Sequence, residues 1–215
     1  MLAIATKAYV ADEIVLDARL ALFHEREGWL AIADLHYGFE LSQRAAGRLV
    51  PFWGMESSRA RLLQLLDEYQ PARLLLLGDL VHDAAAKSPL LELLARVGEK
   101  CEVVVIAGNH DRQLADTLAF RDVYQTDAFV FHHGNTTCAS NGRVQIIGHF
   151  HPAAMLRDGA GLRLRFPALY QEENCWIMPA FSPWAGGVVR ECSAQSRVWL
   201  CTPQRIFPLA NEEAD

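Results

Sequence analysis

Five short polar motifs follow one another along the chain, and each contains side chains that can bind a metal ion. They are Asp34-Leu35-His36, Gly78-Asp79, Gly108-Asn109-His110-Asp111, His132-His133-Gly134 and Gly148-His149-Phe150-His151. Seven of the eight histidines lie in or beside these motifs, and His24 alone stands apart. Carboxylate, amide and imidazole ligands in this mixture suit manganese, iron or zinc. Together the motifs predict a site for two metal ions.

The spacing within the motifs indicates how the ligands are presented. Asp34 and His36 are two residues apart, so at an extended strand end their side chains would point the same way and reach one metal. His149 and His151 have the same spacing, and the same expectation applies to them. The carboxylate of Asp79 has two oxygens with which to bridge two cations. Taken singly, each of these residues could instead be a turn, cap or core residue.

Each motif is expected to follow a short apolar strand. The strands predicted before the motifs cover residues 29–33, 73–77, 102–107, 129–131 and 144–147, and two earlier strands cover 14–16 and 20–24. Helices are predicted over 38–46, 56–69 and 89–97, with Ser57 or Ser58 capping the second and Ser88 the third. In open α/β sheets ligands bind outside the carboxyl ends of the strands, so the five motifs can converge on one site.

The pattern changes after His151. Short strands separated by glycine, proline and polar turns are predicted over 162–166, 175–178, 188–189, 197–201 and 205–207. These strands predict a mostly antiparallel layer, formed by the last third of the chain, that covers the first half. No low-complexity linker divides the two parts, so residues 1–215 are interpreted as one α/β domain.

The composition limits the partners of the protein. The chain has 215 residues and a net charge of −6, and its lysines and arginines are dispersed. This argues against a free-standing binder of duplex DNA, which usually carries a basic stripe. A short nucleic-acid substrate stays open, because two divalent cations would make the site locally positive.

No targeting or membrane segment is expected. The apolar stretches are too short to cross a bilayer, and residues 1–10 do not have the pattern of a signal peptide. The five cysteines are Cys101, Cys138, Cys175, Cys192 and Cys201, an odd number with no Cys-x-x-Cys pair. They are expected to be reduced, in a cytoplasmic protein without membrane partners.

The complete set of motifs resembles that of the calcineurin-like metallophosphoesterase family, whose pattern is D-x-H, G-D, G-N-H-D/E, H and G-H-x-H. The resemblance covers about residues 29–152. It implies an α/β sandwich of two β-sheets flanked by helices and a phosphate-ester substrate. It also implies two divalent metal ions, with manganese the first choice and iron or zinc the alternatives.

The resemblance also implies roles for individual residues. One metal would be bound by Asp34, His36, Asp79 and His151, and the second by Asp79, Asn109, His133 and His149. Asp79 would bridge the two, and His132 is the alternative to His133. His110 would be the general acid that protonates the leaving alkoxide, with His82 or Asp83 orienting it.

A second set of residues is similar to the DNA-ligase-associated branch of that family. These residues are Arg44-Ala45-Ala46-Gly47, Val50-Pro51, Met178-Pro179-Ala180-Phe181-Ser182 and Gly186-Gly187. The branch is phosphodiesterase- or nuclease-like and linked to bacterial DNA repair, which implies a nucleic-acid substrate and a repair protein as partner. Phe52, Trp53 and Trp184 could stack on a base, although packing is the simpler role for each.

Two other functions stay open. The first is hydrolysis of a small phosphorylated metabolite or nucleotide. The second is a non-catalytic scaffold of the same fold, a class of protein that tends to lose metal ligands or the histidine of the G-N-H motif. His110 and all the ligand residues are present here, which favours catalysis. The oligomeric state does not follow from the sequence.

Overall fold

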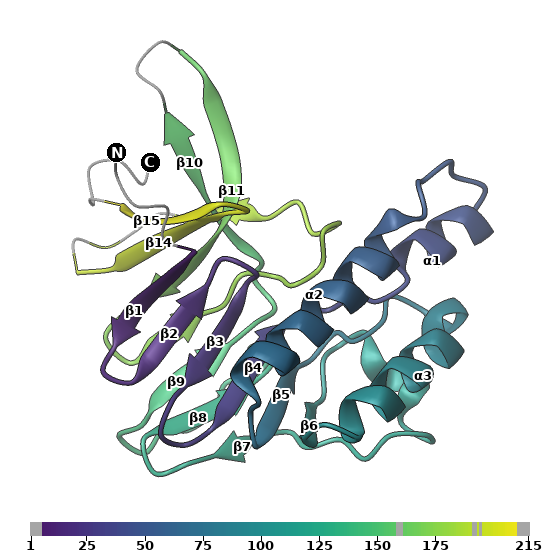
Figure 1. The fold of residues 1–215 in the computed structure, drawn as a ribbon, viewed down its shortest axis with the longest axis horizontal. Coiled ribbons are helices and arrows are strands. Elements are labelled where there is room, and N and C mark those ends of the chain that lie inside the picture. The colour runs from purple at the N-terminus through teal and green to yellow at the C-terminus, as the bar shows by residue number, and fades with distance from the viewer. Residues whose placement is uncertain (1–5, 158–160, 191–192, 194, 210–215) are drawn as a thin grey trace.

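The computed structural model describes residues 6–157, 161–190, 193 and 195–209. Two β-sheets pack against each other, and three α-helices lie together beside the parallel part of the first sheet (Figure 1). The expected fold class, an α/β sandwich of two sheets flanked by helices, is confirmed. Cys192 and residues 1–5 lie outside the described part of the chain. The other four cysteines, Cys101, Cys138, Cys175 and Cys201, are free.

The first sheet has six strands in chain order. They are β1 (Lys7–Ala11), β2 (Ile14–Asp17), β3 (Ala21–His24), β4 (Trp29–Ala33), β5 (Arg73–Leu77) and β6 (Glu102–Ile106). The first four strands pair antiparallel, and β4, β5 and β6 pair parallel. All of β4 and residues 74–77 of β5 are buried, as their continuous apolar sequences require in a parallel sheet covered on both faces. The parallel arrangement brings the carboxyl ends of three strands to one edge.

The second sheet contains the remaining strands. They are β7 (Tyr124–Gln125), β8 (Phe129–His132), β9 (Val144–Ile147), β10 (Pro152–Arg157), β11 (Arg163–Gln171), β12 (Cys175–Ile177), β13 (Val188–Val189), β14 (Arg197–Thr202) and β15 (Arg205–Leu209). Their order is β13-β10-β11-β12-β9-β8-β7, with β14 pairing β11 and β15. The strands of the last third of the chain pair mostly antiparallel, as predicted. The layer also contains β8 and β9, which was not predicted, because β12 pairs parallel with β9. The strands β1, β7 and β10 were not predicted.

The helices are α1 (Phe39–Ala45), α2 (Trp53–Tyr69) and α3 (Lys87–Gly98), with short 3-10 helices η1 (Ala84–Ala86) and η2 (Asp111–Leu114). The predicted serine caps were wrong, because Ser57, Ser58 and Ser88 all lie inside helices. The buried carboxylate of Glu40 in α1 instead accepts a hydrogen bond from the backbone N–H of Met55, in the first turn of α2. This acceptor comes from another helix, so local sequence patterns could not indicate it.

Aromatic side chains fill the space between the sheets. The ring of Trp29 in β4 lies 5.0 Å from that of Phe131 and 5.6 Å from that of Phe129, both in β8. The ring of His24 lies 5.7 Å from Phe129, so the one histidine outside the motifs belongs to this core. In the described part of the chain, no helix is both long and apolar enough to cross a membrane.

Asp17 links the first sheet to α2 through a buried network. Its carboxylate accepts hydrogen bonds from the guanidinium of Arg19, at 2.8 and 2.6 Å, and from the hydroxyl of Tyr69, at 2.8 Å. Burial alone would raise the pKa of Asp17, but these hydrogen bonds outweigh it and hold the pKa below its usual value. The ionised carboxylate therefore stabilises the folded protein.

We expect Asp17→Asn to lower the free energy of unfolding by about 2–3 kcal/mol at pH 7, because hydrogen bonds to a charged partner are lost. Since the pKa is lower in the folded state, this contribution is present above the unfolded pKa of about 4 and is lost as the pH falls toward the folded value. Urea unfolding of the wild-type protein and of Asp17→Asn at pH 7 and pH 3 measures the difference in their free energies of unfolding. Glu13→Gln, which removes an exposed pair with Arg26, should change stability by less than about 1 kcal/mol. A difference for Asp17→Asn that is as large at pH 3 as at pH 7 would contradict the electrostatic explanation.

Candidate metal centre

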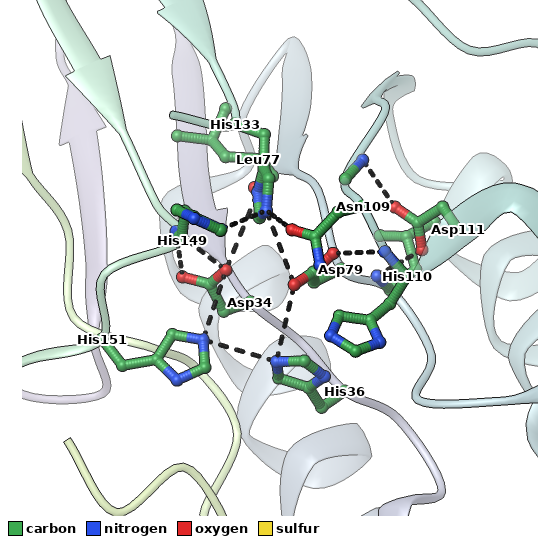
Figure 2. Close-up of polar contacts among 12 residues, drawn as sticks. Asp34, His36, Leu77, Asp79, Asn109, His110, Asp111, His133, His149 and His151 are labelled. Carbon is green, nitrogen blue, oxygen red and sulfur yellow. Dashed lines mark hydrogen bonds and ion pairs between the residues drawn. The ribbon is translucent and has the colours of Figure 1, made fainter. Parts of the chain in front are cut away.

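The five motifs meet where the carboxyl ends of strands from both sheets come together. Asp34 follows β4, Asp79 follows β5 and Asn109 follows β6, whereas His133 follows β8 and His149 follows β9. Figure 2 shows these side chains directed toward one another. The site is therefore built between the two sheets, and not along the edge of one open sheet.

One group of metal-binding side chains consists of Asp34, His36 and His151, whose ligand atoms all lie within 4.8 Å of one another. The Nε2 atom of His151 is 3.5 Å from Oδ1 of Asp34 and 3.4 Å from Nε2 of His36. Asp34 is fully buried, and its carboxylate accepts a hydrogen bond from the backbone N–H of His149. These three residues can ligate a single ion.

A second group consists of Asp79, His133 and His149. The Nε2 atom of His133 lies 3.5 Å from Oδ2 of Asp79, 3.2 Å from Nδ1 of His149 and 3.1 Å from Oδ1 of Asn109. The amide oxygen of Asn109 therefore belongs to the same cluster. Nδ1 of His133 faces the carbonyl oxygen of Leu77 at 2.9 Å, which leaves Nε2 directed into the cluster.

Asp79 lies between the two groups. Its Oδ2 is 3.9 Å from Nε2 of His36 in the first group and 3.5 Å from Nε2 of His133 in the second. Its Oδ1 accepts a hydrogen bond of 3.0 Å from the backbone N–H of His110, which fixes the orientation of the carboxylate. One carboxylate is thus shared by both clusters.

The backbone at the site is unusual. Five residues of the two groups have positive φ angles: Asp34 (52°), His36 (39°), Asp79 (48°), His149 (69°) and His151 (45°). Such angles are uncommon outside glycine and cost free energy that the surrounding structure must offset. The expectation of extended strand ends was therefore wrong. The turns direct His149 and His151 into different groups, although Asp34 and His36 stay together.

Two glycines make room for this arrangement. A Cβ atom on Gly108 would lie 2.3 Å from Oδ1 of Asp79, and one on Gly78 would lie 2.3 Å from Nδ1 of His133. Gly78 also has a φ of 78°, which favours glycine. The glycine that precedes the ligand in these two motifs is thus explained by the close approach of the opposing residue, which at Gly108 includes the backbone nitrogen of Asp79 at 2.2 Å.

Asp111 joins two of the motif loops, a role that the sequence did not indicate. Its buried carboxylate accepts hydrogen bonds from the backbone N–H of Leu80 at 2.8 Å and of Gly108 at 2.9 Å. Burial raises its pKa above the usual value. Asp111 is the last residue of the G-N-H-D motif, and its place there was the only signal of its importance.

The electrostatics of the cluster suit metal binding. Burial raises the pKa of Asp79, but hydrogen bonding to His133 and to the N–H of His110 outweighs it, and the pKa is about 2. Burial lowers the pKa of His36 to about 4 and also lowers that of His149. Burial likewise disfavours the charged form of His133, but the neighbouring carboxylate of Asp79 outweighs it and raises the pKa of that imidazole. An ionised carboxylate and neutral imidazoles are the forms in which these side chains ligate metals. The pKa shifts at Asp79, His36 and His149 therefore favour ligation, whereas the charged form of His133 would have to lose a proton to bind a metal.

The donor set itself fits two divalent ions. The buried carboxylates of Asp34 and Asp79 form no ion pair with a lysine or arginine among the described residues. Buried carboxylates without such partners are costly, and divalent cations would offset their charge. Nδ1 of His36 is also buried without a hydrogen-bond partner in the described part of the chain.

The two residues of the fourth motif differ in position. The imidazole of His133 lies in the cluster, whereas Nε2 of His132 is 2.9 Å from the side-chain oxygen of Gln145. Successive residues of a strand point to opposite faces of the sheet. Of the two alternatives, His133 is the residue that the structure brings to the other ligand candidates.

His110 and His82 lie beside the cluster. The His110 ring is 5.6 Å from that of His36 and stacks on that of His82, with centroids 5.3 Å apart and an interplanar angle of 24°. The carboxylate of Asp83 accepts a hydrogen bond from the N–H of Ala85 and so caps η1. Of the two residues considered for orienting His110, His82 is the one in contact with it.

Comparison with known proteins agrees with this geometry. The family model described as calcineurin-like phosphoesterase matches residues 30–176. The chain belongs to the calcineurin-like phosphoesterase family. The resemblance of the five motifs is thereby confirmed. No protein of curated function matches the chain.

Two solved structures are similar to this family member. The nuclease MPE of Pseudomonas putida is 28% identical, with a TM-score of 0.72, and the match covers 91% of this chain and 94% of that one. Yfce, a phosphoesterase from E. coli, is 17% identical, with a TM-score of 0.45 and coverage of 87% and 94%. The likeness to the nuclease is consistent with the expected DNA-ligase-associated type of branch.

Proposed function

We propose that this protein is a dinuclear metal-dependent phosphodiesterase that cleaves nucleic acid. The observation that carries the proposal is the pair of ligand groups on either side of Asp79. One ion would be held by Asp34, His36, Asp79 and His151, and the other by Asp79, Asn109, His133 and His149. Such ions supply charge neutralisation at a phosphate and activation of a water molecule. These ligands suit manganese, iron or zinc, and manganese is the first choice that the family resemblance implies.

His110 is the proposed general acid. Its ring contacts the ring of His36 without belonging to either ligand group, so it can hold a proton beside a phosphate bound at the cluster. The hydrogen bond from its backbone N–H to Asp79 fixes its position relative to the ligands. His82 stacks on it and restricts the orientation of the ring. His110 would donate that proton to the leaving oxygen, and His82 acts as a positioning residue.

Nucleic acid is the proposed substrate for two reasons. One is the likeness to a protein described as a nuclease. The other is a row of rings that leads from the cluster to the surface: His110, His82, Phe39, Trp184 and Trp53, with successive centroids 5.3, 5.1, 6.2 and 4.9 Å apart. Trp184 is anchored by a hydrogen bond from its indole N–H to Glu40, whereas Trp53 is 52% exposed. Exposed aromatic rings beside a cleavage site can stack on bases.

The test compares three substrates in the presence of Mn²⁺: bis-p-nitrophenyl phosphate, p-nitrophenyl phosphate and a single-stranded DNA oligonucleotide. We expect turnover of the diester and the oligonucleotide, and little of the monoester. Turnover of the monoester alone would instead favour a phosphatase of small metabolites. Absence of all turnover with manganese bound would favour a scaffold. Activity on DNA would in turn support the role in DNA repair that the branch resemblance implies.

Replacement of Trp53 tests the row of rings. We expect Trp53→Ala to weaken oligonucleotide binding about tenfold, because one stacked base contributes about 1–3 kcal/mol. The salt dependence of binding should stay the same, since stacking displaces no counterion. Fluorescence anisotropy of a labelled strand measures both. Tyr9→Ala, which removes a 63% exposed ring from β1, is the matched control. Equal affinities for the two variants would argue that Trp53 does not contact the strand.

A further inference from the structure

Arg61 is a half-buried cation without a carboxylate partner in the part of the chain that the structure describes. It lies on α2, and its Nη2 donates a hydrogen bond to the carbonyl oxygen of Phe181. The guanidinium carbon lies 3.9 Å from the centroid of the Phe181 ring. Nε is buried and has no hydrogen-bond partner among the described residues, and no ion pair of Arg61 occurs there. Burial lowers the pKa of Arg61 to about 10, so the side chain is still charged at neutral pH.

Packing alone does not explain this arginine. Withdrawing part of a charged side chain from water without a counter-ion is costly, and one carbonyl and one aromatic ring offset only part of that cost. An uncharged side chain of similar length could pack on Phe181 without the cost. A half-buried guanidinium whose Nε–H has no partner among the described residues is therefore suited to an anion that arrives from solution.

Arg61 lines a pocket of about 470 Å³ next to the metal centre. His151, from the first ligand group, forms part of the same wall, and Arg165 of β11 supplies a second guanidinium. Arg165 is exposed and forms no ion pair within the described ranges. Arg19 also lines the pocket, but Asp17 and Glu68 neutralise it. No aspartate or glutamate is among the described lining residues, so the pocket is locally positive in a protein whose net charge is −6.

The rest of the wall is largely apolar. Pro152, Phe166, Pro167 and Pro183 line the pocket with small residues of the loop that follows β12. Its volume falls within the range of about 300–1,000 Å³ that is usual for small-ligand pockets. A site for inorganic phosphate alone would need neither this volume nor an apolar wall. A nucleotide has both the anionic and the apolar part that such a wall requires.

We propose that this pocket, the Arg61 pocket, binds the nucleotide adjacent to the scissile bond. Arg61 and Arg165 bind its phosphate, and the apolar wall contacts its sugar or base. This inference rests on the proposed function, because it assigns the pocket to the same substrate strand. Binding in the Arg61 pocket would make the protein select an oligonucleotide, which carries a second phosphate, over a small diester, which carries only one.

The test uses Arg61→Met, Arg61→Lys and Arg165→Ala, each in a Mn²⁺-loaded protein that also carries His110→Ala, so that cleavage is slow. Anisotropy of a labelled single-stranded oligonucleotide is measured between 50 and 300 mM salt. Arg26→Ala is the matched control, because Arg26 is an exposed arginine in the turn before β4, at the opposite end of that strand from Asp34. Thermal unfolding of each variant checks that it is folded.

We expect Arg61→Met to weaken binding about 10- to 100-fold and Arg165→Ala about two- to fivefold. Each should reduce the slope of log K against log salt by about 0.7, the value for one lost phosphate contact on a single strand. Arg61→Lys should restore part of the affinity, and Arg26→Ala should change neither quantity. In a protein that keeps His110, the single substitution Arg61→Met should lower kcat/KM for the oligonucleotide far more than for bis-p-nitrophenyl phosphate.

The outcomes separate the two proposals. If the wild-type protein cleaves the oligonucleotide while Arg61→Met and Arg165→Ala keep the affinity and the salt slope, the Arg61 pocket is not a nucleotide site and the proposed function stands. If the wild-type protein cleaves bis-p-nitrophenyl phosphate but neither binds nor cleaves the oligonucleotide, the nucleic-acid function fails and the pocket assignment fails with it. If Arg61→Met is unfolded, the affinity of Arg165→Ala for the oligonucleotide and the salt dependence of that affinity decide the outcome.

Discussion

Replacement of Asp79 by asparagine is expected to abolish manganese-dependent diester hydrolysis and most of the binding of metal. Its Oδ2 is the carboxylate oxygen that faces both His36 and His133, so the loss of its charge affects both ligand groups. The amide keeps the size of the side chain and can still accept the hydrogen bond from the N–H of His110. The change therefore removes charge and a metal-binding oxygen without opening a cavity.

Metal binding can be measured without turnover. At a concentration 100 times its Kd, an ion stabilises the folded protein by about 2.7 kcal/mol, which raises the Tm of a domain of this size by about 5–10 °C. We expect manganese to raise the Tm of the wild-type protein by this amount and that of Asp79→Asn by much less. Asp67→Asn removes the same charge from an exposed pair with Lys100 and should behave as wild type. An undiminished rise in the Tm of Asp79→Asn would remove this residue from the metal centre.

Replacement of His110 by alanine is expected to lower kcat for oligonucleotide cleavage by about 10²- to 10⁴-fold, the usual contribution of a general acid. Manganese should still raise the Tm, because the imidazole of His110 belongs to neither ligand group. This combination of lost turnover and retained metal binding distinguishes His110 from Asp79.

The leaving group provides a control for the role of His110. A nitrophenolate leaves readily without a proton, whereas the alkoxide of a sugar does not. The loss of activity in His110→Ala should therefore be much smaller on bis-p-nitrophenyl phosphate than on the oligonucleotide. Equal losses on both substrates would mean that His110 acts in some way other than protonation. His82→Phe, which keeps a ring beside His110, should retain more activity than His82→Ala.

Much of the site followed from the sequence, because the chemistry of a side chain is a property of its residue type. The order of the motifs, the apolar strand before each of them and the mixture of carboxylate and imidazole ligands are all local features. They were sufficient to predict the family, the fold class and the set of residues that meet. Residue types alone did not indicate that His133, and not His132, faces the cluster, because that depends on which face of β8 is directed toward the other sheet.

What only the tertiary structure decided depends on residues far apart in the chain. The left-handed turns at Asp34 and His149 persist because the assembled sheets hold them, and they separate His149 from His151 in a way that spacing could not indicate. The carboxylate of Glu40 accepts a hydrogen bond from a backbone N–H in the first turn of α2. The strand β12 joins β8 and β9 to the second sheet. Arg61 and His151 line the same pocket although they are 90 positions apart in the chain. Residue type and local pattern thus determined which chemistry is present, whereas long-range packing determined where each group points, because neither strain nor pairing between distant segments is a local property of sequence.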